Sequence, residues 1–121
     1  MRIVLADENV VSRKKIRRIF EILGYSIVGE ARNGLHVFHK YVELNPDLLI
    51  MSLNMTMYDG LSTVKRIIDY DKQAKVVVMV EPGENKKAFE AMAYGAIHYL
   101  TLPADKHQVE LLMHDVVRIL E

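Results

Sequence analysis

Short aliphatic runs alternate with longer amphipathic segments along the whole chain, and this alternation restricts the fold more than any other feature. The runs rich in aliphatic residues cover 3–6, 26–31, 48–51, 75–80 and 97–101. Between them, apolar residues recur at the spacing of an amphipathic helix. Strands that alternate with helices favour parallel sheets joined by right-handed crossovers. We therefore predict an α/β fold with five parallel strands and helices on both faces.

The ends of the predicted helices carry recognisable signals. The first helix, from about Val11 to Leu23, ends at Gly24, and the second ends at Asn45-Pro46. Asp105-x-x-Gln108 opens the last helix as a capping box. The run at 48–51 is the most hydrophobic and suits a central strand that is buried on both faces.

Length and composition exclude several classes of protein. The chain has 121 residues, with 16 basic and 16 acidic side chains and no cysteine. A neutral chain has no global field that draws it to nucleic acid or to an anionic membrane. No disulfide framework is possible, and the N-terminus lacks a secretory signal. We predict one domain over residues 1–121 that is cytoplasmic and binds neither nucleic acid nor membrane.

Polar side chains follow the predicted strands at the edge where parallel sheets gather their function. Asp7 and Glu8 follow the first strand, Ser52 and Asn54 follow the third, and Glu81 follows the fourth. The fifth strand is followed by Leu102-Pro103.

Four motifs around these positions resemble the receiver domains of two-component response regulators, including the chemotaxis-type stand-alone receivers. The motifs are LADEN, GYSIVGEARNG, PDLLIMSLNMTMYDG and YGAIHYLTLP, and the resemblance covers nearly the whole chain. It implies a flavodoxin-like, doubly wound sheet of strand order 2-1-3-4-5 in a three-layer α/β/α arrangement. It also implies a role in phosphorelay signal transduction.

The resemblance assigns a role to each polar position. In that family an acidic pair binds Mg²⁺, and a carboxylate after the third strand takes a phosphoryl group from a partner histidine. A Ser or Thr after the fourth strand and a Lys before a proline then contact the phosphoryl oxygens. The acidic pair is retained here as Asp7 and Glu8, but the other three positions carry Ser52, Glu81 and Leu102. The remaining positions that match the pattern are Asn54, Asp59, Gly60, Tyr99 and Pro103.

Each of the three changes opposes phosphoryl transfer. A serine hydroxyl needs a neighbouring base to become a nucleophile, and Leu102 offers no cation to the transferred group. Glu81 adds repulsion of roughly 3 kcal/mol per pair of unit charges at about 5 Å and an effective dielectric of about 20. We predict no enzymatic activity, and at best a weak Mg²⁺ site at Asp7, Glu8 and Asn54.

These observations favour a pseudo-receiver that acts by protein contact, and two alternatives stay open. Ser52 could be phosphorylated by a kinase, or the chain could be a flavodoxin-like nucleotide or flavin binder. The second alternative is disfavoured because Asp7-Glu8-Asn9 would repel a phosphate. The resemblance implies a histidine kinase, phosphotransfer protein or effector as partner.

Several other residues have more than one reading. A homodimer could form through the helix at 84–94, the strand at 97–101 and the last helix, where Leu111 is exposed. Tyr99 is expected to be fixed either inward or outward. His36 and His39 are read as a surface pair. The first helix is read as a solvated basic face or as a dock for an acidic partner; its basic residues are Arg13, Lys14, Lys15, Arg17 and Arg18.

Overall fold

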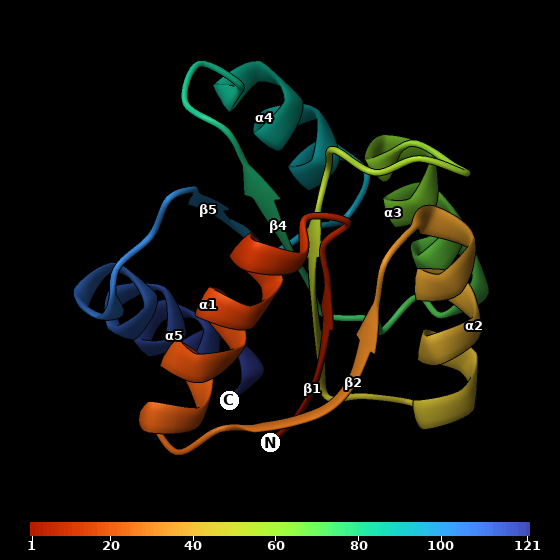
Figure 1. Ribbon diagram of the computed structural model, residues 1–121. Coiled ribbons are helices and arrows are strands. Elements are labelled where there is room, and N and C mark those ends of the chain that lie inside the picture. The colour runs from red at the N-terminus through yellow and green to blue at the C-terminus, as the bar shows by residue number, and fades with distance from the viewer.

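The computed structural model describes residues 1–121 and contains five strands and five helices in strict alternation (Figure 1). The strands are β1 (Arg2–Ala6), β2 (Ser26–Ala31), β3 (Leu48–Ser52), β4 (Val76–Val80) and β5 (His98–Thr101). The helices are α1 (Val10–Ile22), α2 (Gly34–Leu44), α3 (Gly60–Tyr70), α4 (Asn85–Ala93) and α5 (Lys106–Leu120).

All strand pairs are parallel, in the order β2-β1-β3-β4-β5. Helices α1 and α5 cover one face of the sheet, and α2, α3 and α4 cover the other (Figure 1). The predicted fold class, strand order and layers are therefore confirmed. None of the helices combines the length and apolar character that crossing a membrane requires.

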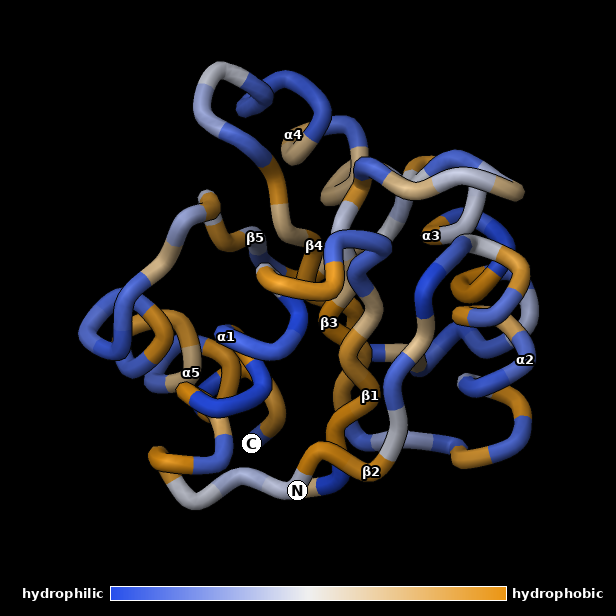
Figure 2. Tube along the Cα trace, in the orientation of Figure 1, coloured by the Kyte–Doolittle hydropathy of each residue, from blue (hydrophilic) through white to orange (hydrophobic).

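The two cores follow from the alternation of side chains along each strand. Ile3 and Leu5 of β1 pack toward α1 and α5, while Val4 and Ala6 pack toward α2, α3 and α4. Every residue of β3 and β4 is buried. The apolar residues accordingly concentrate along the central strands (Figure 2), as predicted for the run at 48–51.

The two edge strands are short or irregular. The pairing of β2 with β1 shifts between Ile3 and Val4, so that Val28 lies outside the regular register. At the opposite edge, β5 has only four residues.

Side chains cap four of the helices. Asn9, Asn33 and Asp59 accept backbone N–H groups in the first turns of α1, α2 and α3. The predicted capping box of α5 is present, with Asp105 and Gln108 bonded reciprocally. Asn45 ends α2 in a left-handed conformation, at the position where the sequence predicts the stop.

The prediction of a solvated basic face on α1 is wrong for Arg13, and Arg17 is partly exposed. The Arg13 side chain is only 11% exposed, and its Nε donates to Glu30 Oε1 of β2 at 2.9 Å. Arg17 also pairs with Glu30, which raises the pKa of the Arg17 guanidinium through the hydrogen bond. Lys14, Lys15 and Arg18 remain exposed.

Gly60 is required for space at the start of α3. A Cβ added there would lie 2.3 Å from Leu53 Cα and 2.6 Å from the Leu53 carbonyl oxygen. We therefore expect Gly60→Ala to lower the free energy of unfolding by about 3 kcal/mol, because the backbone itself must move. Urea unfolding followed by circular dichroism measures this change.

Gly24→Ala is the matched control. No atom lies within 4 Å of a Cβ at Gly24, whose φ is +90°, so the substitution carries only a conformational cost of about 1–2 kcal/mol. Equal losses in the two variants would contradict the steric explanation for Gly60.

Candidate functional site

The carboxyl ends of β1, β3 and β4 meet around a polar cavity of about 320 Å³, which we call the acidic cavity. Its lining contains no apolar side chain and no lysine or arginine; the lining residues are Asp7, Glu8, Asn9, Ser52, Asn54 and Glu81. The prediction that the polar residues after β1, β3 and β4 meet at one edge of the sheet agrees with this lining. Three carboxylates give the cavity its negative charge.

Asp7 is buried to 4% exposure directly after β1. Its Oδ1 accepts the N–H of Asn9 at 3.0 Å. Its Oδ2 has no hydrogen-bond partner. No other buried side-chain nitrogen or oxygen atom of the molecule lacks one. A buried carboxylate oxygen without a donor retains its full desolvation cost.

Glu8 is exposed and holds two loops together. Its Oε2 accepts both the N–H of Thr56, at 2.7 Å, and the Thr56 hydroxyl, at 2.9 Å. One oxygen of Glu8 is therefore already used to fix the loop between β3 and α3.

Ser52 is the last residue of β3 and is only 4% exposed. Its Oγ accepts the N–H of Asn54 at 3.1 Å. The hydroxyl donates to no carboxylate and no histidine, so no base stands in position to activate it.

Asn54 joins a network that sequence reasoning missed. Its Nδ2 donates to Glu84 Oε1 at 2.9 Å, and the same oxygen accepts the N–H of Glu81 at 2.8 Å. Lys87 Nζ lies 3.0 Å from Glu84 Oε2 and 3.4 Å from Asn54 Oδ1. The Glu84-x-x-Lys87 spacing at a helix start was the available signal.

These contacts stabilise the ionised form of Glu84. The N–H of Glu81 contributes most, followed by the side chains of Asn54 and Lys87, and together they lower the pKa of Glu84 to about 2. The loop between β4 and α4 is thus attached to the loop after β3 by a charged network.

Two of the matched loop residues, Asp59 and Gly60, support the site from a distance. Asp59 accepts the N–H and the hydroxyl of Ser62, both at 2.9 Å, and these bonds lower the pKa of Asp59. Gly60 lets α3 pack against Leu53. Both residues shape the loop and neither lines the acidic cavity.

Leu102 lines a second cavity, of about 340 Å³, which we call the apolar cavity. It lies between the start of α1 and the segment after β5, and its apolar lining consists of Val11, Ile16, Leu102, Pro103 and Ala104. It shares Asn9 and Glu81 with the acidic cavity. Leu102 itself is buried, so a hydrocarbon side chain stands where the resemblance implies a lysine.

Tyr99 lies in β5, half-buried against the core on the α4 side. Its ring meets that of Phe89 edge to face, with 5.9 Å between the centroids. The Tyr99 N–H donates to Nδ1 of His98, whose Nε2 then donates to Asp115 at 3.1 Å. Sequence reasoning gave His98 no role, because its partner lies on α5.

The side chains of the acidic cavity do not form a complete Mg²⁺ site. Asp7 Oδ2 is free, but Glu8 is partly engaged and Ser52 replaces a carboxylate by a neutral hydroxyl. No cluster of three histidine, cysteine, aspartate or glutamate residues has a geometry suited to a metal. Mg²⁺ prefers near-octahedral oxygen ligands, so this donor set supports weak binding at best.

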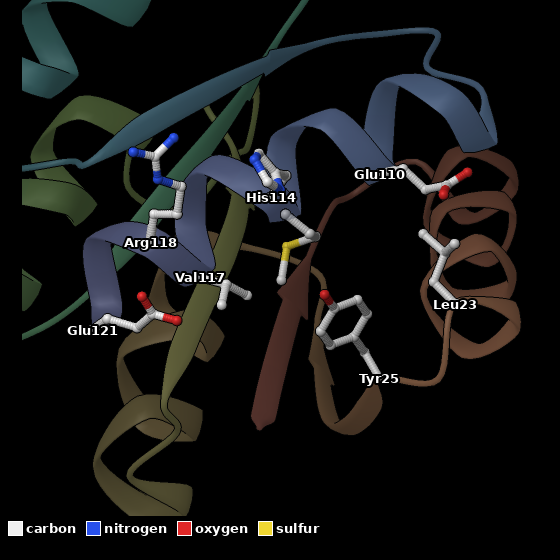
Figure 3. A pocket seen from close by; sticks show the side chains of 8 residues that line it. Leu23, Tyr25, Glu110, His114, Val117, Arg118 and Glu121 are labelled. Carbon is white, nitrogen blue, oxygen red and sulfur yellow. The ribbon is translucent and has the colours of Figure 1, made fainter.

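The largest cavity, about 430 Å³, lies elsewhere, beside Tyr25, where β2 begins (Figure 3). Leu23, Tyr25 and Val117 border it, with Glu110 and Arg118 among its charged neighbours (Figure 3). It is remote from the strand ends and contains no buried polar atom without a partner. Size alone does not make it the functional site.

Comparison with known proteins agrees with the fold and the motifs. The family model of the response regulator receiver domain matches residues 3–114. Chemotaxis protein CheY of Thermotoga maritima is 31% identical over 108 residues, which make up 89% of this chain and 90% of that protein.

Two solved structures are similar over nearly the whole chain. A two-component response regulator of the LuxR family from Aurantimonas sp. is 28% identical, with a TM-score of 0.86, over 98% of this chain and 84% of that one. A chain of the CheX–CheY–BeF3–Mg complex from Borrelia burgdorferi is 24% identical, with a TM-score of 0.91. The match covers 97% of this chain and 89% of that one. This second likeness concerns the fold alone. The family match, the similarity to CheY and the strand order agree, and the chain belongs to the response regulator receiver domains of two-component signalling, with the character of the chemotaxis type.

Proposed function

We propose that this receiver domain signals through protein contacts without being phosphorylated and without catalysing a reaction. The observation that carries the proposal is the lining of the acidic cavity, which has three carboxylates, a neutral serine and no cation. A phosphoryl group entering it meets repulsion of roughly 3 kcal/mol per charge pair at about 5 Å and an effective dielectric of about 20. Nothing in the lining offsets that repulsion.

The environment of Ser52 argues against two routes of phosphorylation: attack by Ser52 on a phosphoryl donor, and modification of Ser52 by a kinase. A serine that attacks a phosphoryl donor requires a neighbouring base, and the Ser52 hydroxyl has none. A kinase must instead reach the hydroxyl, yet Ser52 is 4% exposed at the end of a central strand. The nucleotide or flavin alternative requires a phosphate near Asp7 and Glu8, where the charge is also unfavourable.

The network around Glu84 offers a permanent substitute for a phosphorylation-dependent connection. Asn54 lies after β3, and Glu84 lies between β4 and α4. Their hydrogen bond joins these two segments with no ligand between them. We infer that the domain keeps one arrangement of the β4–α4 loop, which suits a constitutive binding module.

The surface formed by α4, β5 and α5 is the proposed contact region for a partner or for a second copy of the chain. These elements carry several exposed large apolar side chains, among them Phe89, Met92, Tyr94 and Leu111. Burial of such side chains at an interface is favourable, and exposed apolar patches mark contact sites. The half-buried Tyr99 lies between α4 and α5 in this surface.

The proposal predicts that phosphoryl analogues do not bind. When beryllofluoride is added to the labelled protein already in Mg²⁺, amide resonances of residues 7, 52, 81 and 102 should stay unshifted in ¹H–¹⁵N spectra. Acetyl phosphate should likewise leave the intact mass unchanged. Saturable shifts at these residues would contradict the proposal.

A gain-of-function variant serves as the control for this experiment. Ser52→Asp, Glu81→Thr and Leu102→Lys together restore an anionic acceptor, a hydroxyl and a cation. The triple variant should bind beryllofluoride in the presence of Mg²⁺, which shows that the assay detects binding on this scaffold. Each double variant, with two of the three substitutions, should bind beryllofluoride more weakly than the triple variant.

The Glu84 network predicts a pH dependence of stability with a definite sign. Because folding lowers the pKa of Glu84 from 4.5 to about 2, its contribution is complete above about pH 4.5 and disappears as pH falls toward 2. Carboxyl-carbon NMR should report this low pKa in the wild type. Asn54→Ala should raise it only in part, because the N–H of Glu81 remains.

Lys72, with Asp69, supplies the matched comparison for Lys87. Both lysines pair with a carboxylate three residues earlier in the sequence: Lys72 Nζ lies 3.4 Å from Asp69, and Lys87 Nζ lies 3.0 Å from Glu84. Lys87→Met should raise the pKa of Glu84, whereas Lys72→Met should leave it unchanged. If both substitutions raised the pKa of Glu84 equally, that pKa would depend on the overall surface charge and not on the contact with Lys87.

The proposed contact surface predicts self-association that depends on Leu111. Leu111 is 55% exposed on α5, and Val42 of α2, which is 42% exposed, lies outside the surface. In sedimentation velocity, the weight-average mass of the wild type should rise with concentration. Leu111→Asp should abolish this rise and Val42→Asp should preserve it; the reverse pattern would move the interface to α2.

A further inference from the structure

The acidic cavity and the apolar cavity adjoin, because Asn9 and Glu81 line both, and together they make one candidate site. The site is anionic at the acidic cavity and carries hydrocarbon side chains, beside the polar Ser12 and Lys15, at the apolar cavity. We infer that it binds a primary ammonium ion carrying an apolar chain, and we call it the amine cleft. The inference deepens the proposed function and rests on its claim that the cavity takes no phosphoryl group.

Asp7 supplies the strongest argument for a cationic ligand. Asp7 is 4% exposed and belongs to the lining of the acidic cavity, and its buried Oδ2 has no hydrogen-bond donor. A buried carboxylate oxygen is stabilised most by a charged donor. An ammonium group carries three donors and no acceptor, so it can bond to Asp7 and to further oxygens of the lining at once.

Glu81 and Glu8 add charge that the protein does not neutralise. The Glu81 side chain makes no hydrogen bond or ion pair, and one oxygen of Glu8 remains after its bonds to Thr56. Ser52 Oγ lies in the same lining. The cavity therefore presents three carboxylates to a guest and attracts cations in preference to anions.

The nearby cations of the chain are engaged elsewhere or lie free at the rim. Arg13 is bound to Glu30 and to the Asp7 backbone oxygen, and Lys87 is bound to Glu84. Lys15, at the apolar cavity, is exposed and forms no ion pair. No internal ammonium group occupies the position next to Asp7 Oδ2.

The apolar cavity explains why the ligand should carry a hydrocarbon chain. Val11, Leu102 and Pro103 belong to its lining, and it shares Asn9 and Glu81 with the acidic cavity. Each methylene removed from water contributes about a fourfold gain in affinity. An alkylamine should therefore bind more tightly than methylamine, and a neutral alcohol of the same chain length should lack the bond to Asp7.

Titration of the labelled protein with n-hexylamine at pH 7 tests the inference. Saturable amide shifts are expected near Asp7, Ser52 and Glu81 and at residues 102–104. Methylamine should bind more weakly, and 1-hexanol should give no saturable shift at Asp7. A short blocked peptide with one lysine beside leucine separates the two sources of such an ammonium group, a free amine and a protein side chain.

Two variants with the same charge change locate the ligand. Asp7→Asn keeps the shape of the side chain but offers no carboxylate, and it should weaken hexylamine binding at least about tenfold. Glu110→Gln alters the larger cavity of Figure 3 and should leave the affinity unchanged. Leu102→Met keeps the apolar lining and should bind, whereas Leu102→Lys supplies an internal ammonium group and should abolish binding.

Three results would overturn the inference: no saturable hexylamine shifts, equal affinity of the wild type and Asp7→Asn, or tighter binding of Mg²⁺ that displaces the amine. Thermal unfolding of each variant verifies that it is folded. Beryllofluoride on the wild type is a separate arm. Binding of that analogue would contradict the proposed function, whereas failure of hexylamine alone would contradict only the amine cleft.

Discussion

The complete burial of β3 and β4 is the constraint on which the rest of the structure depends. Because helices cover both faces, neither strand can slip by one residue without moving a whole row of apolar side chains to the wrong core. The parallel register then fixes where each strand ends. Ser52 and Glu81 reach the same edge as Asp7 as a consequence of packing, irrespective of the chemistry that these residues can perform.

The residues that maintain the scaffold of this receiver domain are therefore different from the residues that would perform its chemistry. The parts that maintain the scaffold are intact: Asp59 caps α3, Gly60 lets the helix approach Leu53, and Glu8 holds Thr56. Of the three positions that depart from the family pattern, Ser52 and Glu81 line the acidic cavity, whereas Leu102 is buried in the core beneath α1 and α5. An electrostatic property of the site was thus free to change while the three-layer architecture stayed the same.

The sequence predicted what local patterns determine, and missed what depends on pairing between distant elements. The strands, the stop at Asn45 and the capping box at Asp105 follow from periodicity and local hydrogen bonding. The pairs Arg13–Glu30 and His98–Asp115 do not, since each joins two elements whose relative rotation sequence cannot give. The strand-end rule anticipated that the ends of β1, β3 and β4 meet, but Leu102 and Pro103 line the neighbouring cavity. Bonds between distant segments, such as Asn54 to Glu84, do not follow from that rule.

The irregular pairing of β2 and the four-residue length of β5 affect how this molecule can meet others. A sheet edge with unpaired N–H and C=O groups is a template for adding a strand from another chain, which leads to aggregation when it is unplanned. A bulge distorts one edge here, and the other edge offers too few residues for a long ladder. Association through backbone hydrogen bonds is therefore discouraged, and recognition falls to helical side chains, which can be specific without exposing the sheet.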